Sequence, residues 1–138
     1  MMLIRTYLGP SGIHGVGVFA GEPIERGAAV WARHPVLDLV VTRQMRAGLP
    51  DAMVSYLDTY TYPVGDEADG RVMLDCDNGR YMNHSDAPNT SFKGEGGRAS
   101  VRIEMGTEIT CDYREFYPKA VWERMAFLMP DGEQTTET

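Results

Sequence analysis

Residues 80–92, RYMNHSDAPNTSF, concentrate side chains that could take part in chemistry. Tyr81 and Met82 are typical of a strand, and the polar triplet Asn83, His84 and Ser85 follows them directly. Polar groups that enter an interior are costly unless each finds a hydrogen-bond partner. The partners of this triplet must therefore come either from a ligand or from the fold itself.

A second candidate is the glycine-rich stretch GVGVFA at residues 15–20, which matches the pattern G-x-G-x-x-A of dinucleotide-binding loops. Such a loop must open a helix whose N-terminus faces a pyrophosphate. Here the sequence stays strand-like and then meets Gly21 and Pro23, and no acidic residue follows a second strand at the expected distance. We therefore reject a dinucleotide site and predict a tight turn whose glycines let a ligand approach the backbone.

The length of 138 residues suits one domain, and a hydrophobic content of 43% indicates a folded protein. Fifteen glycines and eight prolines predict many short elements joined by turns, and hence a mainly β protein with a few short helices. We expect strands at residues 3–7, 16–20, 30–32, 36–41, 60–62, 71–76, 99–103 and 108–113, a glycine loop at 9–17 and a hairpin tip at 93–98. We expect helices at residues 43–47, capped by Thr42 and stopped by Gly48, at 51–57, and at 120–128.

The chain is acidic, with 13 Lys and Arg against 20 Asp and Glu, for a net charge of −7. Direct binding to nucleic acid is not expected, because phosphate contacts require a basic surface. A cationic partner such as a Lys- and Arg-rich peptide would be steered favourably, although the same acidity also serves solubility. Both interpretations remain open.

Two cysteines, Cys76 and Cys111, are too few for a disulfide scaffold or for a four-cysteine zinc site, so we expect no metal. The first residues, MMLIRTYLGP, do not resemble a signal peptide, and the longest apolar stretch is interrupted by Asp38. It is far too short to span a membrane. We therefore expect a cytoplasmic protein that has no membrane partner.

Three segments, taken in order, resemble the SET domain, the family of protein lysine methyltransferases that use S-adenosylmethionine (AdoMet). They are GVGVF at 15–19, RYMNHS with PN at 80–89, and EITCDY at 108–113. The corresponding family patterns are G-x-G-V-[FY], R-F-[IV]-N-H-S-x-x-P-N and E-[LI]-T-x-D-Y, and residues 74–76 (LDC) are similar to the family's I-D-A stretch. The resemblance spans about residues 4–117.

The resemblance implies a mainly β, β-clip-like fold of small sheets with a few short helices and a C-terminal pseudoknot, in which the late segment threads through an earlier loop. Residues 1–138 would form a single domain of the minimal, free-standing bacterial or viral type. Its core would be residues 4–117, followed by a helical segment at 118–130 and a tail at 131–138. Ser85 and Asn89 would fasten the crossing through bonds from side chain to backbone.

The resemblance also implies a set of cofactor-binding residues. These are Gly15, Val16, Gly17, Arg80, Tyr81, Asn83, His84 and Trp122. Trp122 would cover the adenine, although it could equally be a core residue of the last helix. His84 would contribute its main chain, and its ring is expected to be structural rather than a general base.

By the same resemblance Tyr113 is the catalytic residue, with a tyrosine packed in the core as the alternative. The substrate channel would be lined by Trp31, Tyr60, Tyr62, Phe92 and Cys111. The family's E-Y-x-G-E stretch is missing at residues 30–34, so the first three of these are candidates to replace one wall. Cys111 stands where a Tyr or Phe often limits the number of methyl groups, and Phe92 could fill that space, so the number stays open.

The function implied is transfer of a methyl group from AdoMet to a lysine of a basic protein or peptide. The alternative is a SET-like module that binds a peptide or AdoMet with little catalysis. A homodimer could complete the substrate groove of so small a domain, because two-fold pairing is common.

Overall fold

A computed structural model of the chain describes residues 1–125. The strands are β1 (Thr6–Pro10), β2 (Val16–Ala20), β3 (Ala29–Trp31), β4 (Leu39–Val41), β5 (Thr61–Pro63), β6 (Val72–Leu74), β7 (Asn83–His84), β8 (Thr90–Ser91), β9 (Gly97–Ala99) and β10 (Thr110–Cys111). The helices are α1 (Arg43–Ala47), α2 (Asp51–Tyr60) and α3 (Lys119–Trp122). Short 3-10 turns follow at η1 (Glu67–Asp69), η2 (Asn78–Tyr81) and η3 (Tyr113–Glu115).

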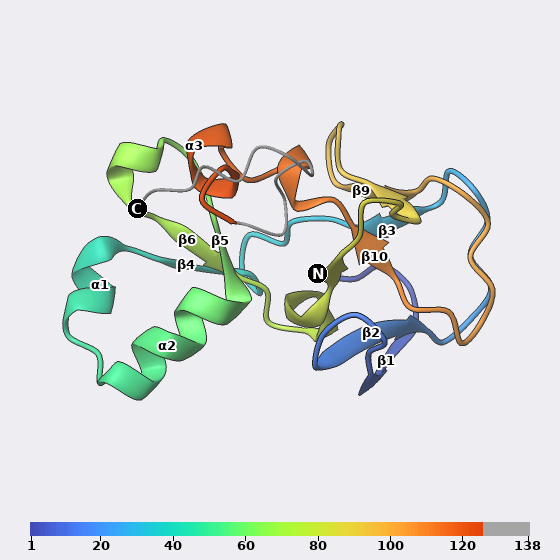
Figure 1. Ribbon diagram of the computed structural model, residues 1–138, viewed down its shortest axis with the longest axis horizontal. Coiled ribbons are helices and arrows are strands. Elements are labelled where there is room, and N and C mark those ends of the chain that lie inside the picture. Colours follow the sequence, from blue (N-terminus) through green and yellow to red (C-terminus); the bar gives the residue numbers. More distant parts are fainter. Residues whose placement is uncertain (126–138) are drawn as a thin grey trace, which may run out of the picture.

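These strands form small separate sheets, as the mainly β prediction requires. Strands β1 and β2 form a hairpin, β3–β9–β8 and β4–β6–β5 form two antiparallel sheets, and β7 pairs with β10 in parallel. In Figure 1 the β4–β6–β5 sheet lies with α1 and α2 at the left, and the other sheets lie at the right. Turn η2 and strand β7 connect the two parts in sequence, since they directly follow β6.

The β1–β2 hairpin differs from the prediction of a strand at residues 3–7 and a loop at 9–17. The first strand begins at Thr6, and Gly9 pairs with Gly17 within the hairpin. A methyl group on Gly9 would lie 3.3 Å from Phe19 Cε2, and the Phe19 ring stacks on Tyr7 with their centroids 5.5 Å apart. Gly9 is therefore needed for close packing inside a strand, and only residues 11–15 form the loop.

The predicted buried strand at residues 36–41 is correct only in its second half. Val36 is 81% exposed, and β4 begins at Leu39. A local turn holds the first half out of the sheet: Asp38 N donates to His34 O at 3.0 Å, and His34 N donates to Asp38 Oδ2 at 2.7 Å. The apolar run alone could not reveal this turn, because it also depends on two polar side chains: Asp38 accepts from His34 N, and His34 Nδ1 accepts from Leu37 N at 3.1 Å.

Both predicted helices after this strand are confirmed. Helix α1 has the predicted bounds, Thr42 Oγ1 accepts from Met45 N at 3.2 Å, and Gly48 follows the last turn. Helix α2 begins at the predicted residue, after Pro50, but continues to Tyr60. The Tyr56 and Tyr60 rings, 4.5 Å apart, extend packing along its last turn.

The predicted strands at 99–103 and 108–113 are shorter than expected, because this segment changes partner along its length. Ile103 bridges to Ile24, Glu108 bridges to Phe19, and Thr110 pairs with Asn83. No single partner continues long enough for an extended ladder. Of the helix predicted at 120–128, the structure shows Lys119–Trp122, and the predictions for residues 126–138 lie outside the described residues.

The hydrophobic core lies beneath the hairpin and the crossing of β7 and β10. Its buried members are Val18, Ala20, Ile24, Val30, Met82, Ala99, Ile103, Ile109 and Cys111. Ile109, which is 0% exposed, directly precedes β10 and links this core to the crossing. Core packing and the position of the late segment therefore depend on the same residues.

We expect Ile109→Ala to lower the free energy of unfolding by about 2–5 kcal/mol, because it leaves a cavity at a fully buried site. The matched control is Ile13→Ala, since Ile13 is 52% exposed and its truncation should change stability by about 0.5 kcal/mol or less. Urea unfolding measures both. Equal losses in the two variants would contradict the placement of Ile109 in the core.

Candidate active site

The crossing of β7 and β10 places two distant segments side by side. Thr110 pairs with Asn83 and Cys111 with His84, and Ser85 N donates to Cys111 O at 3.0 Å. Asn89 fastens this crossing from the side, because its Nδ2 donates to Glu108 O at 2.8 Å and its Oδ1 accepts from Thr110 N at 2.9 Å. The fastening role predicted for Asn89 is thus confirmed.

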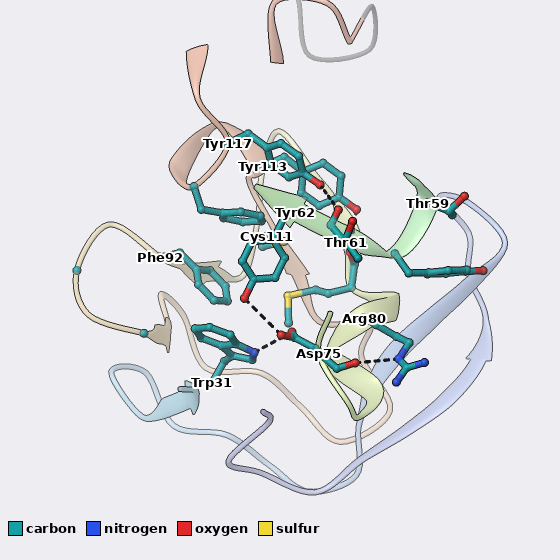
Figure 2. A pocket seen from close by; sticks show the side chains of 16 residues that line it. Trp31, Thr59, Thr61, Tyr62, Asp75, Arg80, Phe92, Cys111, Tyr113 and Tyr117 are labelled. Atoms are coloured by element: carbon teal, nitrogen blue, oxygen red, sulfur yellow. Dashed lines mark hydrogen bonds between the residues drawn. The ribbon is translucent and has the colours of Figure 1, made fainter. Parts of the chain in front are cut away.

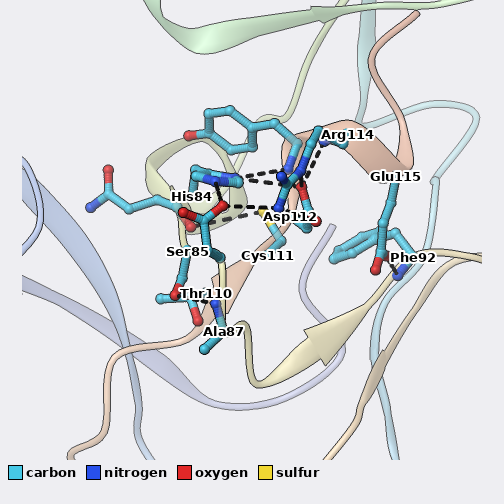
Figure 3. Close-up of polar contacts among 12 residues, drawn as sticks. His84, Ser85, Ala87, Phe92, Thr110, Cys111, Asp112, Arg114 and Glu115 are labelled. Carbon is cyan, nitrogen blue, oxygen red and sulfur yellow. Dashed lines mark hydrogen bonds and ion pairs between the residues drawn. The ribbon is translucent and has the colours of Figure 1, made fainter. Parts of the chain in front are cut away.

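The Ser85 side chain serves a local turn instead. Its Oγ accepts from Ala87 N at 3.1 Å, whereas its backbone N–H makes the bond across the crossing (Figure 3). Its predicted role therefore holds for the main chain and not for the hydroxyl.

Asn83 ties the glycine loop to the crossing. Its Nδ2 lies 3.1 Å from Ser11 Oγ, 3.0 Å from His14 O, 3.2 Å from Val16 O and 3.0 Å from Glu108 Oε1. An amide nitrogen has two hydrogens, so these four acceptors share them. Ser11 Oγ donates to the same Glu108 carboxylate at 2.7 Å, which closes a network between the loop and the late segment.

Two glycines shape this loop for different reasons. Gly15 has φ of +49°, a left-handed conformation that residues with a side chain rarely adopt. Gly17 instead makes room for the late segment, since a methyl group there would overlap the Glu108 carboxylate. The loop backbone and the Asn83–Glu108 network therefore fix each other's positions.

A cavity of about 700 Å³, which we call the loop cavity, opens beside this network. Its walls come from residues 13–16, 59–60 and 80–86 and from Tyr113. Backbone groups of the glycine loop and of strand β7 thus line the same space as polar side chains. Such a mixed wall suits a ligand that has both polar and apolar parts.

A second cavity, of about 240 Å³, has mainly aromatic walls, and we call it the aromatic cavity (Figure 2). Four rings close a cycle around it: Trp31 contacts Phe92, Phe92 contacts Phe116, Phe116 contacts Tyr62, and Tyr62 contacts Trp31. Their centroids are 5.6, 5.6, 5.6 and 6.5 Å apart in that order. The walls suit an apolar chain of small cross-section.

Tyr113 lines both cavities, together with Thr59, Tyr60, Arg80 and Met82. It lies two residues after β10, and its hydroxyl donates to Met82 O at 2.9 Å. Burial raises the pKa of Tyr113 above the ordinary value of a phenol, so the hydroxyl stays protonated at neutral pH. Burial likewise raises the pKa of its neighbour Tyr117 to about 12, and Tyr117 OH donates to Thr61 O at 3.1 Å.

The His84 ring holds the backbone of Tyr113. His84 Nδ1 accepts from Tyr113 N at 3.1 Å, so in this arrangement the ring proton lies on Nε2, which is 3.2 Å from Asp86 Oδ1. Arg114 binds both Asp86 and Asp112 (Figure 3). Burial opposes ionisation of Asp112, yet the hydrogen bonds from Arg114 hold the pKa of that carboxyl below its usual range. The geometry gives the His84 ring a positioning role.

Asp75 is a feature of the aromatic cavity that the sequence did not single out as a site residue. It is 5% exposed, and its carboxylate accepts from Trp31 Nε1 at 3.0 Å and from Tyr62 OH at 3.3 Å. Burial raises its pKa. The available signal was the alternation along β6, which puts Asp75 on the same interior face as Met73.

The structure brings most of the predicted site residues together. Five predicted cofactor residues besides Arg80 line the loop cavity: Gly15, Val16, Tyr81, Asn83 and His84. All the predicted channel residues line the aromatic cavity: Trp31, Tyr60, Tyr62, Phe92 and Cys111.

Two predicted cofactor residues lie elsewhere. Gly17 packs against Glu108, and Trp122 lies on α3, away from the walls that residues 1–125 give to either cavity. Phe116 and Tyr117, which follow Tyr113 in the sequence, also line the aromatic cavity.

Two kinds of feature are absent from residues 1–125. In this range no group of three or more His, Cys, Asp and Glu side chains is arranged to hold a metal ion. No helix in the described part of the chain has both the length and the apolar character to cross a membrane.

Comparison with known proteins identifies the family. A family model described as SET domain matches residues 15–114, which is more than half of the chain. The chain belongs to the SET domain family. No curated protein sequence matches it.

Solved structures that share the SET fold include a crystal structure of a Plasmodium falciparum protein provisionally described as a histone methyltransferase. It is 21% identical, with a TM-score of 0.54 over 81% of this chain and 95% of that chain. Two structures of a humanised mutant of the Chaetomium thermophilum Polycomb Repressive Complex 2, each with a different inhibitor, are also similar. They are 19% and 18% identical, with TM-scores of 0.54 and 0.59 over 83% and 87% of this chain, but over only 15% and 16% of those chains. At these identities the likeness shows a common SET fold.

The raised pKa of Tyr113 predicts a delayed ionisation. Folding stabilises the neutral phenol, so this contribution to stability is complete below the unfolded pKa of about 10 and falls as pH rises above it. A pH titration followed by absorbance at 295 nm counts the tyrosines that ionise. In Tyr113→Phe, one tyrosine fewer should ionise in the part of the curve well above pH 10. The same titration in guanidinium chloride, where all phenols are solvated, is the control. If Tyr113→Phe instead lowered the absorbance change near pH 10, where exposed tyrosines ionise, the burial of this hydroxyl would be contradicted.

Proposed function

We propose that this SET domain is a protein lysine N-methyltransferase that uses AdoMet. The observation that carries the proposal is that Tyr113 lies on the wall shared by the loop cavity and the aromatic cavity. A methyl donor in the first and a lysine side chain in the second would meet at this residue. Membership of the SET family supports the same reaction class.

The residues of the loop cavity fit AdoMet. Backbone groups of Gly15 and Val16 would hold its methionine part, and the main chain of His84 would meet the adenine edge. Asn83 holds the glycine loop beside strand β7, so that both can reach the cofactor, through its bonds to His14 O and Val16 O. When bound, AdoMet supplies a methyl group on a sulfonium, which is a strong electrophile.

The aromatic cavity fits the methylene chain of lysine. A free lysine has a pKa of about 10.4, and only the neutral amine attacks a methyl group. Apolar walls such as Phe92, Phe116 and Cys111 disfavour the charged form at the reacting end. The chain contributes alignment and desolvation, which are the main requirements of an in-line displacement.

Tyr113 would align the amine with the methyl group. Its hydroxyl donates its hydrogen bond to Met82 O, so toward the cavity the oxygen acts as a hydrogen-bond acceptor. An acceptor at this point can orient an amine N–H or contact the methyl hydrogens. The bonds from His84 and Met82 fix the ring in that position.

The substrate that we propose is a basic protein or peptide, which the net charge of −7 would attract. A cytoplasmic location and the absence of nucleic-acid and membrane partners belong to the same proposal. A homodimer that completes the substrate groove is part of it too. Light scattering that shows only monomer would remove the dimer and leave the methyl transfer intact.

Calorimetry with AdoMet, followed by transfer of labelled methyl groups to proteins of a cell extract, tests the function. We expect Tyr113→Phe to lower turnover about a hundredfold through lost alignment, while AdoMet affinity changes by less than about twofold. The control is Tyr7→Phe, which removes an exposed phenol from the hairpin and should change neither quantity.

Each outcome of these measurements decides between explanations. Absence of AdoMet binding would contradict the proposal. Binding without transfer to any protein would favour the alternative, a module that holds AdoMet or a peptide. Full turnover in Tyr113→Phe would show that the hydroxyl has no aligning role.

The conformation of Gly15 gives a separate prediction for the cofactor site. Gly15→Ala should weaken AdoMet binding about tenfold, because alanine disfavours the left-handed conformation by roughly 1–2 kcal/mol. Gly12→Ala is a matched control: at both positions an added methyl group meets nothing within 4 Å, but Gly12 lacks a positive φ. Calorimetry compares them, and equal affinities would show that the loop conformation does not matter for binding.

A further inference from the structure

Asp75 is a buried carboxylate for which residues 1–125 provide no ion-pair partner. It is 5% exposed and lies on the wall of the aromatic cavity. None of the ion pairs in the described part of the chain includes it. Buried charges in proteins are normally paired, so a carboxylate in this situation indicates a site for a cation.

The contacts of Asp75 are with neutral donors. Trp31 Nε1 and Tyr62 OH donate to its two oxygens, as Figure 2 shows. The nearby Arg80 does not neutralise it, because Arg80 Nε donates to the main-chain oxygen of Asp75 and Nη1 donates to Tyr56 OH. A carboxylate can accept about four hydrogen bonds, so two further bonds remain available to a ligand.

The charges that act most on Asp75 are the Met1 ammonium and the carboxylates of Asp38 and Asp77. The Met1 ammonium lowers the pKa of Asp75, but its hydrogen bonds go to Asp38 and to a main-chain oxygen. Asp38 and Asp77 both raise that pKa, and Asp77 is engaged by Met2 N at 2.7 Å. The Met1 ammonium and the Arg80 guanidinium are therefore nearby, but neither pairs with the Asp75 carboxylate, so a ligand cation could do so.

The fold keeps space open for this carboxylate. A methyl group on Gly79 would lie 2.9 Å from Asp75 Oδ2 and 3.5 Å from Trp31 Nε1, which is closer than unstrained packing allows for the carboxylate. Glycine at this position thus preserves the pairing of Asp75 with Trp31. The carboxylate is held at the cavity wall by its surroundings.

We propose that Asp75 supplies the counter-charge for a cationic side chain in the aromatic cavity, so that the cavity selects an alkylammonium group over a neutral chain of the same length. The identity of that cation as the lysine of a substrate rests on the proposed function. The cavity holds about 240 Å³, which as a sphere is about 8 Å across, so an ammonium anywhere inside it is near the carboxylate. Charges at such distances interact strongly where water is excluded.

Asp75 and Tyr113 differ in the cavities that they line. Tyr113 also lines the loop cavity, whereas Asp75 does not. Selection of a charged side chain can therefore be assigned to Asp75, and alignment of the amine with the methyl group to Tyr113. Asp75 is accordingly a specificity residue, and Tyr113 remains the aligning residue.

The test uses two small probes and the indole signal of Trp31, whose N–H is bonded to Asp75. The sequence contains two tryptophans, so the Trp31 signal is the one that persists in Trp122→Phe. Nuclear magnetic resonance would follow it during titration with n-butylammonium and with 1-butanol. We expect the cation to half-saturate the shift at a concentration about tenfold lower than the alcohol, because only the cation pairs with the carboxylate.

Two variants of equal net charge distinguish the effect of the Asp75 carboxylate from that of the overall charge of the protein. In Asp75→Asn the two probes should become equivalent within about twofold, since the amide keeps the shape and loses the charge. In Asp51→Asn, which removes an exposed carboxylate at the start of α2, the tenfold preference should remain. Equal binding of both probes to the unchanged protein, or an undiminished preference in Asp75→Asn, would overturn the inference.

Thermal melting would reveal whether Asp75→Asn folds. If it does not, the comparison of the two probes with the unchanged protein still tests the inference. No cofactor is needed in these titrations. A protein that prefers the ammonium probe but does not bind AdoMet would refute the proposed function and not this inference. A protein that transfers methyl groups but binds both probes equally would refute this inference and not the proposed function.

Discussion

The parallel pairing of β7 with β10 is the constraint on which the site depends. Parallel neighbours cannot be joined by a tight turn, so the late segment must return past residues that lie far away in sequence. This crossing buries backbone and side-chain polar groups, and Asn83, Asn89 and Thr90 satisfy them with bonds to the opposite segment. Because Tyr113 follows β10 by two residues, its place on the wall of both cavities is a direct consequence of this pairing.

The same constraint links the shape of the loop cavity to folding. Asn83 bonds to the glycine loop and to Glu108, so one amide fixes the shape of the loop cavity and secures the late segment. Gly17 belongs to this arrangement although it does not line the cavity, since only glycine leaves room for the Glu108 carboxylate. Gly17, which we predicted to touch the cofactor, therefore contributes by leaving space for the Glu108 carboxylate.

How much of this the sequence could predict depends on how local the cause is. Helix α1 was predicted to the residue, because Thr42 and Gly48 act within one turn of the backbone. The strand at residues 36–41 was predicted too long, because the turn between His34 and Asp38 is made by side chains. The site residues were accessible only through the family resemblance, since no local pattern shows that Trp31, Tyr62 and Phe92 meet in space. Asp75 was missed for a related reason: alternation along β6 predicts that it is buried, but its lack of an ion-pair partner appears only in the folded chain.

The proposed reaction would place two opposite electrostatic demands on the aromatic cavity. In the proposed reaction a lysine would arrive as a cation and react as a neutral amine. The Asp75 carboxylate favours the charged form, whereas Phe116 and Cys111 disfavour it. Asp75 lines only the aromatic cavity, where Trp31 and Tyr62 hold its carboxylate, whereas Tyr113 also faces the loop cavity, so the proposed selection and the proposed alignment use different residues.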